Sequence, residues 1–220
     1  ATRWLDFGAI TFQPGEILKI VFPLYVSSWL SQNAKRAKSF FEGFLPLLIL
    51  MGFVAFILLL QPSTTTAAII LFSAVMVYFV AGARFRFFPL LGVFIALALA
   101  SLIAFTPYRL ERVKTFFYPE EADALGEGYH RNQAEIAVGS GGMFGVGYGK
   151  STTKLNYLPE PIGDSMFAVI AEELGFVGGA ALIALFLALI VRGFMIAKNS
   201  RDQFAKLAII GFISVIAIQT

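Results

Sequence analysis

Acidic and basic side chains gather between residues 139 and 175, in a glycine-rich stretch that separates two apolar segments. A carboxylate can take a proton from an attacking hydroxyl group, and a lysine can neutralise the charge of a phosphate. Charged groups beside a membrane-spanning segment cost free energy, so a cluster of them there points to a functional site. The charged members of the stretch are Lys150, Lys154, Glu160, Asp164, Glu172 and Glu173.

Two familiar site motifs do not fit this chain. The segment GVGYGKS ends like a phosphate-binding loop, but Phe144 stands where the pattern GxxxxGK[ST] requires its first glycine. The chain has one histidine, His130, and no cysteine, which excludes an HExxH metal site and a thiolate or disulfide site within it. The glycines are better suited to letting the backbone bend or approach a lipid head group closely.

The apolar composition predicts an all-α polytopic membrane protein. Hydrophobic residues make up 58% of the 220 residues, and the mean hydropathy is +0.77. Several apolar runs are long enough to cross the hydrocarbon core of a bilayer. We expect one transmembrane domain over residues 1–220, an internal fragment of a longer protein, with about five complete helices and a truncated sixth. These helices are 14–30, 44–60, 66–83, 87–105, 176–195 and 204–220.

Lysine and arginine are distributed unevenly over the links between these helices. The links after the first, third and fifth helices hold seven of them, and Arg192 and Lys206 at the adjoining helix ends bring the number to nine, whereas the N-terminal lead and the turn at 61–65 hold only Arg3. Because cytoplasmic loops carry the excess of positive charge, we place those three links in the cytoplasm. Residues 106–163 then form a large extracytoplasmic loop, and the charged stretch faces outward.

The segment 164–195 is too long for a single span. Its 32 residues follow one helical pattern without an obvious stop. As a helix it would measure about 48 Å, against a hydrocarbon core of about 30 Å. Glycines between 175 and 179 offer a bend, so we expect 164–174 to be an outer helical piece that carries Glu172 and Glu173. The first interpretation of these two glutamates is as structural polar contacts.

Other charged residues each allow two interpretations. Glu16 and Lys19 share one helix face, which predicts either a local ion pair or a polar contact inside the helix bundle. Asp164 stands near the start of the outer piece, where a carboxylate can cap a helix. Six basic residues of the outer segment suggest an anionic partner such as a lipid phosphate, or else a solvated surface with paired acids. They are Arg109, Arg112, Lys114, Arg131, Lys150 and Lys154.

Four segments together resemble one known family. They are RWLDFGAITFQPGEILK at 3–19, YRLERVKTFFYP at 108–119, GYHRNQAEIAVGSGGMFGVGYGKSTTKLNYLPE at 128–160 and DSMFAVIAEELGFVGG at 164–179. In this order they are similar to the SEDS family (shape, elongation, division and sporulation), the peptidoglycan polymerases typified by FtsW, RodA and SpoVE. The run KLNYLPE looks closer to the division and sporulation branch than to the elongation branch.

The resemblance implies a ten-helix fold, of which this chain is the central part, and an activity that polymerises lipid II during cell division or shape maintenance. It places the family's essential aspartate, from the motif LPEAHTD, on Asp164. Pro161, Ile162 and Gly163 replace the A-H-T of that motif, and Ser63 replaces the aspartate of a QPD-type turn.

Glycosyl transfer with a pyrophosphate leaving group needs a base for the attacking hydroxyl and positive charge for the departing phosphates. We expect Asp164 to be the base and Lys154 to contact phosphate, with weaker contributions from Arg109 and Lys150. Glu160 is a further candidate for substrate contact. The sequence requires no cofactor, although a divalent cation, Mg²⁺ or Mn²⁺, could bridge Asp164 and the pyrophosphate.

The resemblance also implies partners and a location. The partners are lipid II, a class B penicillin-binding protein and other membrane proteins of the divisome or elongasome; no nucleic acid is expected. The location is the bacterial cytoplasmic membrane, crossed several times, with the active face outside. Two alternatives stay open: a lipid II flippase, which would need a polar path through helices whose centres are nearly free of charge, and a non-enzymatic scaffold, which would tolerate the loss of Asp164.

Overall fold

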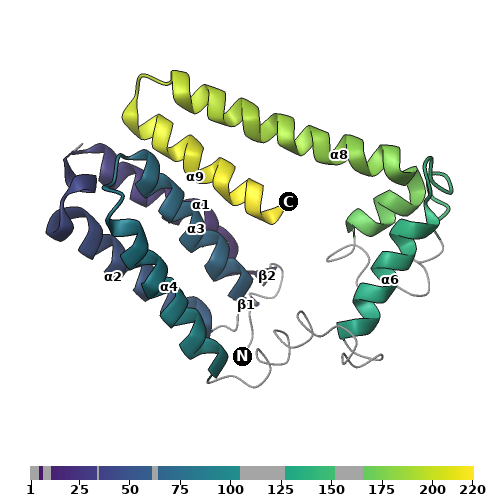
Figure 1. Cartoon of the computed structure of the whole chain (residues 1–220), viewed down its shortest axis with the longest axis horizontal. Helices are drawn as coiled ribbons and strands as arrows, with labels where there is room; N and C mark the ends of the chain where they lie inside the picture. Colours follow the sequence, from purple (N-terminus) through teal and green to yellow (C-terminus); the bar gives the residue numbers. More distant parts are fainter. Residues whose placement is uncertain (1–4, 7–10, 34, 61–63, 105–126, 152–165) are drawn as a thin grey trace. The chain divides into compact units, whose positions relative to one another are not determined.

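The computed structural model describes residues 5–6, 11–33, 35–60, 64–104, 127–151 and 166–220 (Figure 1). The chain divides into two compact units: Ala1–Phe94 with Phe186–Thr220, and Ile95–Leu185. The first unit holds most of the apolar helices. The second holds the glycine-rich stretch in which the charged residues gather.

Three helices form the centre of the first unit: α1 (Pro14–Ser31), α3 (Thr64–Val80) and α9 (Gln203–Gln219). They lie side by side and pack against one another (Figure 1). Helix α1 starts with Pro14 at its first position, where the missing N–H group costs nothing. Helix α9 starts after Asp202, whose carboxylate accepts hydrogen bonds from the backbone N–H groups of the first turn.

The three helices meet at a glycine. A Cβ atom built on Gly211 of α9 would lie 2.8 Å from Cβ of Pro23 in α1 and 3.1 Å from Cγ2 of Val77 in α3. Only a residue without a side chain leaves room for this approach, since real carbon contacts are longer. The absence of a side chain at position 211 therefore sets how closely the three helices pack.

A short irregular segment leads into α2 (Leu45–Leu60). It consists of a 3₁₀ turn, η1 (Arg36–Lys38), and a π-helical turn, η2 (Phe40–Phe44). The buried hydroxyl group of Tyr78 in α3 donates a 2.9 Å hydrogen bond to the carbonyl oxygen of Ala37, which ties η1 to α3.

Helix α4 (Phe87–Ala104) continues the first unit and extends into the second. The ring of Phe44 stacks on the ring of Phe87, with centroids 5.0 Å apart. Ahead of α1, strands β1 (Leu5–Asp6) and β2 (Thr11–Phe12) pair antiparallel. Apart from this two-stranded ladder, the regular secondary structure in the described part of the chain is helical, as the sequence predicts.

The second unit contains α6 (Glu127–Ser140) and the first half of α8 (Met166–Asn199). Helix α6 lies inside the segment 106–163, which the sequence predicts to be an outer loop. Many residues of α6 are polar and glycines follow it at once, so the apolar pattern that identifies the other helices is absent there.

Two described stretches are long and apolar enough to cross a membrane, namely Phe40–Leu58 and Met166–Asn199. Shorter apolar helices occupy Thr65–Val80, Phe87–Ala96 and Gln203–Gln219. Only 11% of the apolar window in Met166–Asn199 is buried within the structure. Most of the apolar surface of that window is therefore exposed in the structure.

Candidate functional site

Helix α8 is broken at Gly175, where φ is 69° and ψ is −168°, a conformation open essentially to glycine alone. This is one of the three glycines at which the sequence predicts a bend. In an unbroken helix, the N–H groups of Phe176 and Val177 would donate to carbonyl groups four residues earlier. Here they donate instead to the carbonyl oxygens of Gly142, at 2.8 Å, and Met143, at 3.2 Å.

The carbonyl groups released by the bend also find partners in the same loop. The oxygen of Glu172 accepts from the N–H of Val146 at 3.0 Å, and the oxygen of Glu173 accepts from the N–H of Gly147 at 3.1 Å. Two helical hydrogen bonds are missing at the bend. The loop supplies new acceptors for their two N–H groups and new donors for their two carbonyl groups. Since unpaired backbone groups are costly when buried, the bend and the loop stabilise each other.

Glycines allow the loop to approach the helix main chain. A Cβ atom on Gly141 would overlap the carbonyl oxygen of Ala171, and one on Gly145 would overlap the carbonyl group of Glu173. Gly145 also has a φ of 80°, in the region that favours glycine. We call residues 141–150 together with 172–177 of α8 the loop–bend clamp. Figure 1 shows the loop after α6 lying against the bend of α8.

Two adjacent carboxylates are buried at the clamp. Glu172 is 2% exposed and Glu173 is 7% exposed. The hydroxyl group of Ser151, itself buried, donates a hydrogen bond of 2.5 Å to Oε2 of Glu172. The sequence predicts structural polar contacts for both glutamates but does not single out Ser151, because a serine within a Gly-, Ser- and Thr-rich stretch carries no distinguishing pattern.

The clamp is not a phosphate cradle. The N–H groups of Gly145, Val146, Gly147 and Lys150 all donate to carbonyl oxygens of the protein. A phosphate-binding loop directs such groups at its ligand instead. The side chain of Lys150 is exposed, so any contact that it makes with an anion comes from its ammonium group alone.

Glu16 and Lys19 form an ion pair, which is one of the two contacts that the sequence predicts for them. Nζ of Lys19 lies 2.7 Å from Oε1 of Glu16, and the lysine side chain is 8% exposed against 53% for the glutamate. The pair belongs to α1 in the first unit. Lys19 is the buried member of the pair. The carboxylate of Glu16 offsets the free energy that burying its ammonium group costs.

Four of the predicted site residues lie outside the described residues: Arg109, Lys154, Glu160 and Asp164. The predicted juxtaposition of Asp164 with basic groups is therefore argued below as a proposal. Within the described ranges, no group of three or more histidine, aspartate or glutamate side chains could hold a metal ion. The divalent cation that the sequence allows would bind at Asp164 and belongs to the same proposal.

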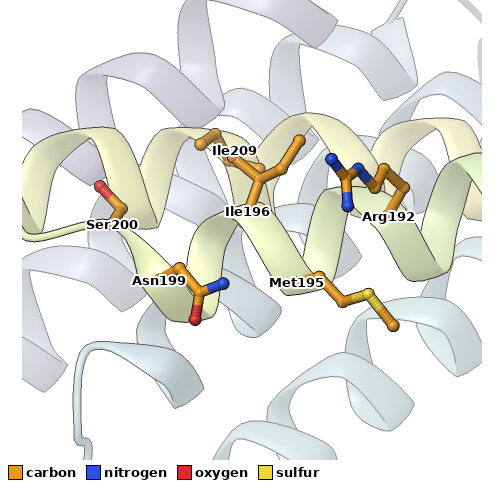
Figure 2. A pocket seen from close by; sticks show the side chains of 6 residues that line it. All are labelled: Arg192, Met195, Ile196, Asn199, Ser200 and Ile209. Carbon is orange, nitrogen blue, oxygen red and sulfur yellow. The ribbon is translucent and has the colours of Figure 1, made fainter.

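A shallow groove of about 340 Å³ lies between the C-terminal part of α8 and α9 (Figure 2). Its lining contains no carboxylate and no nucleophile beyond one serine hydroxyl, and that hydroxyl donates to the carbonyl oxygen of Asp202. The groove therefore offers no base for group transfer. It is lined by Arg192, Met195, Ile196, Asn199, Ser200 and Ile209.

The long apolar helices with exposed surfaces are typical of a helical membrane protein. Its polar site lies where a glycine-rich loop contacts the bend of α8, beside two buried carboxylates. Comparison with known sequences identifies the family. The chain belongs to the FtsW/RodA/SpoVE family of cell cycle proteins, whose profile matches residues 1–220. The family resemblance seen in the sequence is thereby confirmed.

Individual relatives and solved structures agree with this membership. The chain is 38% identical to stage V sporulation protein E of Bacillus subtilis over 216 residues, covering 98% of this chain and 59% of that protein. It is 41% identical over 203 residues to the probable peptidoglycan glycosyltransferase FtsW of Idiomarina loihiensis, covering 92% of this chain and 49% of that protein. The chain thus spans about half the length of these relatives.

Two solved structures share the fold. One is the crystal structure of the rod shape determining protein RodA of Thermus thermophilus, with a TM-score of 0.64, 27% identity and coverage of 100% of this chain and 55% of that chain. The other comes from a study of polymerization and crosslinking by a peptidoglycan synthase complex, with a TM-score of 0.75, 27% identity and coverage of 100% and 60%.

Proposed function

We propose that the protein is a peptidoglycan glycosyltransferase that polymerises lipid II into glycan strands at the outer face of the cytoplasmic membrane, in cell wall synthesis for division or shape maintenance. The observation that carries this proposal is the similarity, at 38 to 41% identity, to several proteins named probable peptidoglycan glycosyltransferase FtsW. The position of Asp164 in the run LPEPIGD, four residues after Glu160, supports it.

The proposed topology follows from the charge of the links. Nine lysine or arginine residues in alternate links and at the helix ends beside them favour a cytoplasmic location for those links, so that 106–163 and the outer helical piece lie outside. The five complete spans and the partial sixth belong to this proposal. The bend at Gly175 supports it, because the helix beyond the bend is almost purely apolar while Glu172 and Glu173 precede it.

The proposed reaction joins two sugars and releases a lipid pyrophosphate. A sugar hydroxyl of one chain attacks the anomeric carbon of the other, and the bond from that carbon to the pyrophosphate oxygen breaks. The bonding electrons leave with undecaprenyl pyrophosphate, which departs as an anion and needs no proton. The proton of the attacking hydroxyl passes to the carboxylate of Asp164, which acts as general base.

Basic residues of the outer segment would neutralise the leaving group. Lys154, ten residues before Asp164, is the main candidate for a phosphate contact, with Arg109 and Lys150 as weaker ones. Glu160 is proposed as a substrate contact. A divalent cation such as Mg²⁺ or Mn²⁺ would stabilise the pyrophosphate when bound, and a fall in the rate on adding EDTA would reveal it.

A class B penicillin-binding protein is the proposed partner, together with other membrane proteins of the divisome or elongasome. The support is the fold shared with a structure that comes from a peptidoglycan synthase complex. Copurification of the full-length protein with a penicillin-binding protein from membranes would test this partnership directly.

The decisive experiment measures lipid II polymerisation by the purified full-length protein, with and without its partner. Asp164→Asn should abolish glycan formation while the protein elutes and unfolds like the wild type. Asp202→Asn is the matched control, because it makes the same change at an exposed helix cap, where asparagine also caps well. Retained activity in Asp164→Asn would contradict its role as base, and lipid II transport without polymer would indicate a flippase.

A further inference from the structure

The hydrogen bond between Ser151 and Glu172 joins two buried polar side chains. Its two residues are 1% and 2% exposed, so a carboxylate and a hydroxyl group have both been removed from water. Burying a carboxylate costs free energy that apolar packing at the same place would not. The contact joins positions 21 residues apart, so local helix geometry does not create it.

Glu172 holds the loop at two points. Its backbone carbonyl oxygen accepts from the N–H of Val146, and its side-chain Oε2 accepts from the hydroxyl of Ser151. The first bond belongs to the loop–bend clamp, and the second lies five residues further along the chain. One residue of α8 therefore fixes both the body of the loop and the position at which the chain leaves it.

The chain that leaves this point carries the proposed base. Ser151 directly precedes residues 152–165, and α8 begins directly after them at Met166. Glu172 lies six residues into α8, which is about 9 Å along the helix axis. Both ends of a 14-residue segment that includes Asp164 are thus attached to the first two turns of one helix.

We propose that Ser151 and Glu172 are positioning residues for glycosyl transfer, an inference that rests on the proposed function. Their hydrogen bond fixes where the segment bearing Asp164 starts relative to α8. The proposed role requires neither residue to touch the substrate. Loss of the bond misplaces the base rather than removing it, so the turnover number falls while the binding of lipid II is nearly unchanged.

The test uses the full-length protein and four variants in the lipid II polymerisation assay. Because misplacing a catalytic group can slow a reaction about 100-fold, we expect Ser151→Ala to lower kcat by about 10- to 100-fold, with KM changed less than about threefold. Ser151→Thr keeps the hydroxyl group and should restore at least about half of the wild-type kcat. Asp164→Asn should be inactive.

Ser73→Ala is the matched control. Ser73 is also fully buried and donates a 2.7 Å hydrogen bond, to the carbonyl oxygen of Ile70 in α3. Its hydrogen bond lies within α3 and does not hold the segment that bears Asp164, so Ser73→Ala should keep the wild-type kcat. A wild-type kcat in Ser151→Ala, or equal losses in Ser151→Ala and Ser73→Ala, would overturn the positioning role.

Hydrogen exchange separates this inference from the proposed function. In Ser151→Ala, amides of peptides covering 152–165 should exchange faster, whereas those of Phe176 and Val177, which are bonded to the loop, should keep their protection. Unchanged exchange in 152–165 contradicts the positioning role whatever the activity. An inactive wild type with faster exchange in the variant contradicts the proposed function and leaves the anchoring of the segment supported.

Discussion

The main chains of Gly145 and Gly175 lie against each other. A Cβ atom built on Gly145 would lie 2.7 Å from the amide nitrogen of Gly175, and one built on Gly175 would overlap the amide nitrogen of Gly145. Both residues have a positive φ, 80° and 69°. Each glycine is therefore required twice, for its own backbone conformation and for the approach of the other.

Gly145→Ala should destabilise the loop–bend clamp. The positive φ alone costs about 1–2 kcal/mol for an alanine, and the new methyl group would also push the loop away from the carbonyl group of Glu173. We expect a lower unfolding temperature in detergent and faster hydrogen exchange at Phe176. Gly139→Ala is the control, since a Cβ there meets nothing within 4 Å. Equal unfolding temperatures for the two variants would refute the close approach.

Gly211→Ala should loosen the packing of α1, α3 and α9. The added carbon would lie 2.8 Å from Cβ of Pro23, so one of the helices must shift. Overpacking of this kind costs about 1–3 kcal/mol, measurable as a lower midpoint of thermal unfolding. Gly92→Ala makes the same change in α4, where a Cβ meets nothing within 4 Å, and should leave the midpoint unchanged or raise it.

Tyr78→Phe removes the hydroxyl group that ties η1 to α3. The carbonyl oxygen of Ala37, in a residue only 1% exposed, would lose its donor. Leaving a buried acceptor unsatisfied costs about 1–3 kcal/mol. Tyr25→Phe is the control because Tyr25 is 55% exposed. An unfolding midpoint that falls equally in both variants would show that the hydrogen bond contributes nothing.

Lys154→Ala should weaken the binding of lipid II if this lysine contacts phosphate. A charge-assisted hydrogen bond contributes about 1.5–3 kcal/mol, so the KM for lipid II should rise about 10- to 100-fold. Lys154→Arg should keep most of the affinity, because arginine also binds phosphate. Lys150→Ala, which removes an exposed ammonium group, should have a smaller effect. A KM that responds more to Lys150→Ala would reverse the ranking of the two lysines.

The sequence by itself identifies the features that depend on neighbours along the chain. Apolar runs predict helices whose ends, except those of α8, fall within three residues of the observed ones. The spacing of Glu16 and Lys19 allows the ion pair that is present, because residues three apart share a helix face. The excess length of 164–195 and its glycines predict the bend that the structure places at Gly175.

Only the tertiary structure decides which groups replace the hydrogen bonds lost at that bend. Their partners, Gly142 to Gly147, lie about 30 residues away, and no periodic pattern links the two segments. The burial of Glu172 with Ser151, and the bond from Tyr78 to Ala37 across 41 residues, are equally invisible in the sequence. Such contacts form because folding brings unpaired polar groups together away from water, where each must find whichever partner the packing supplies.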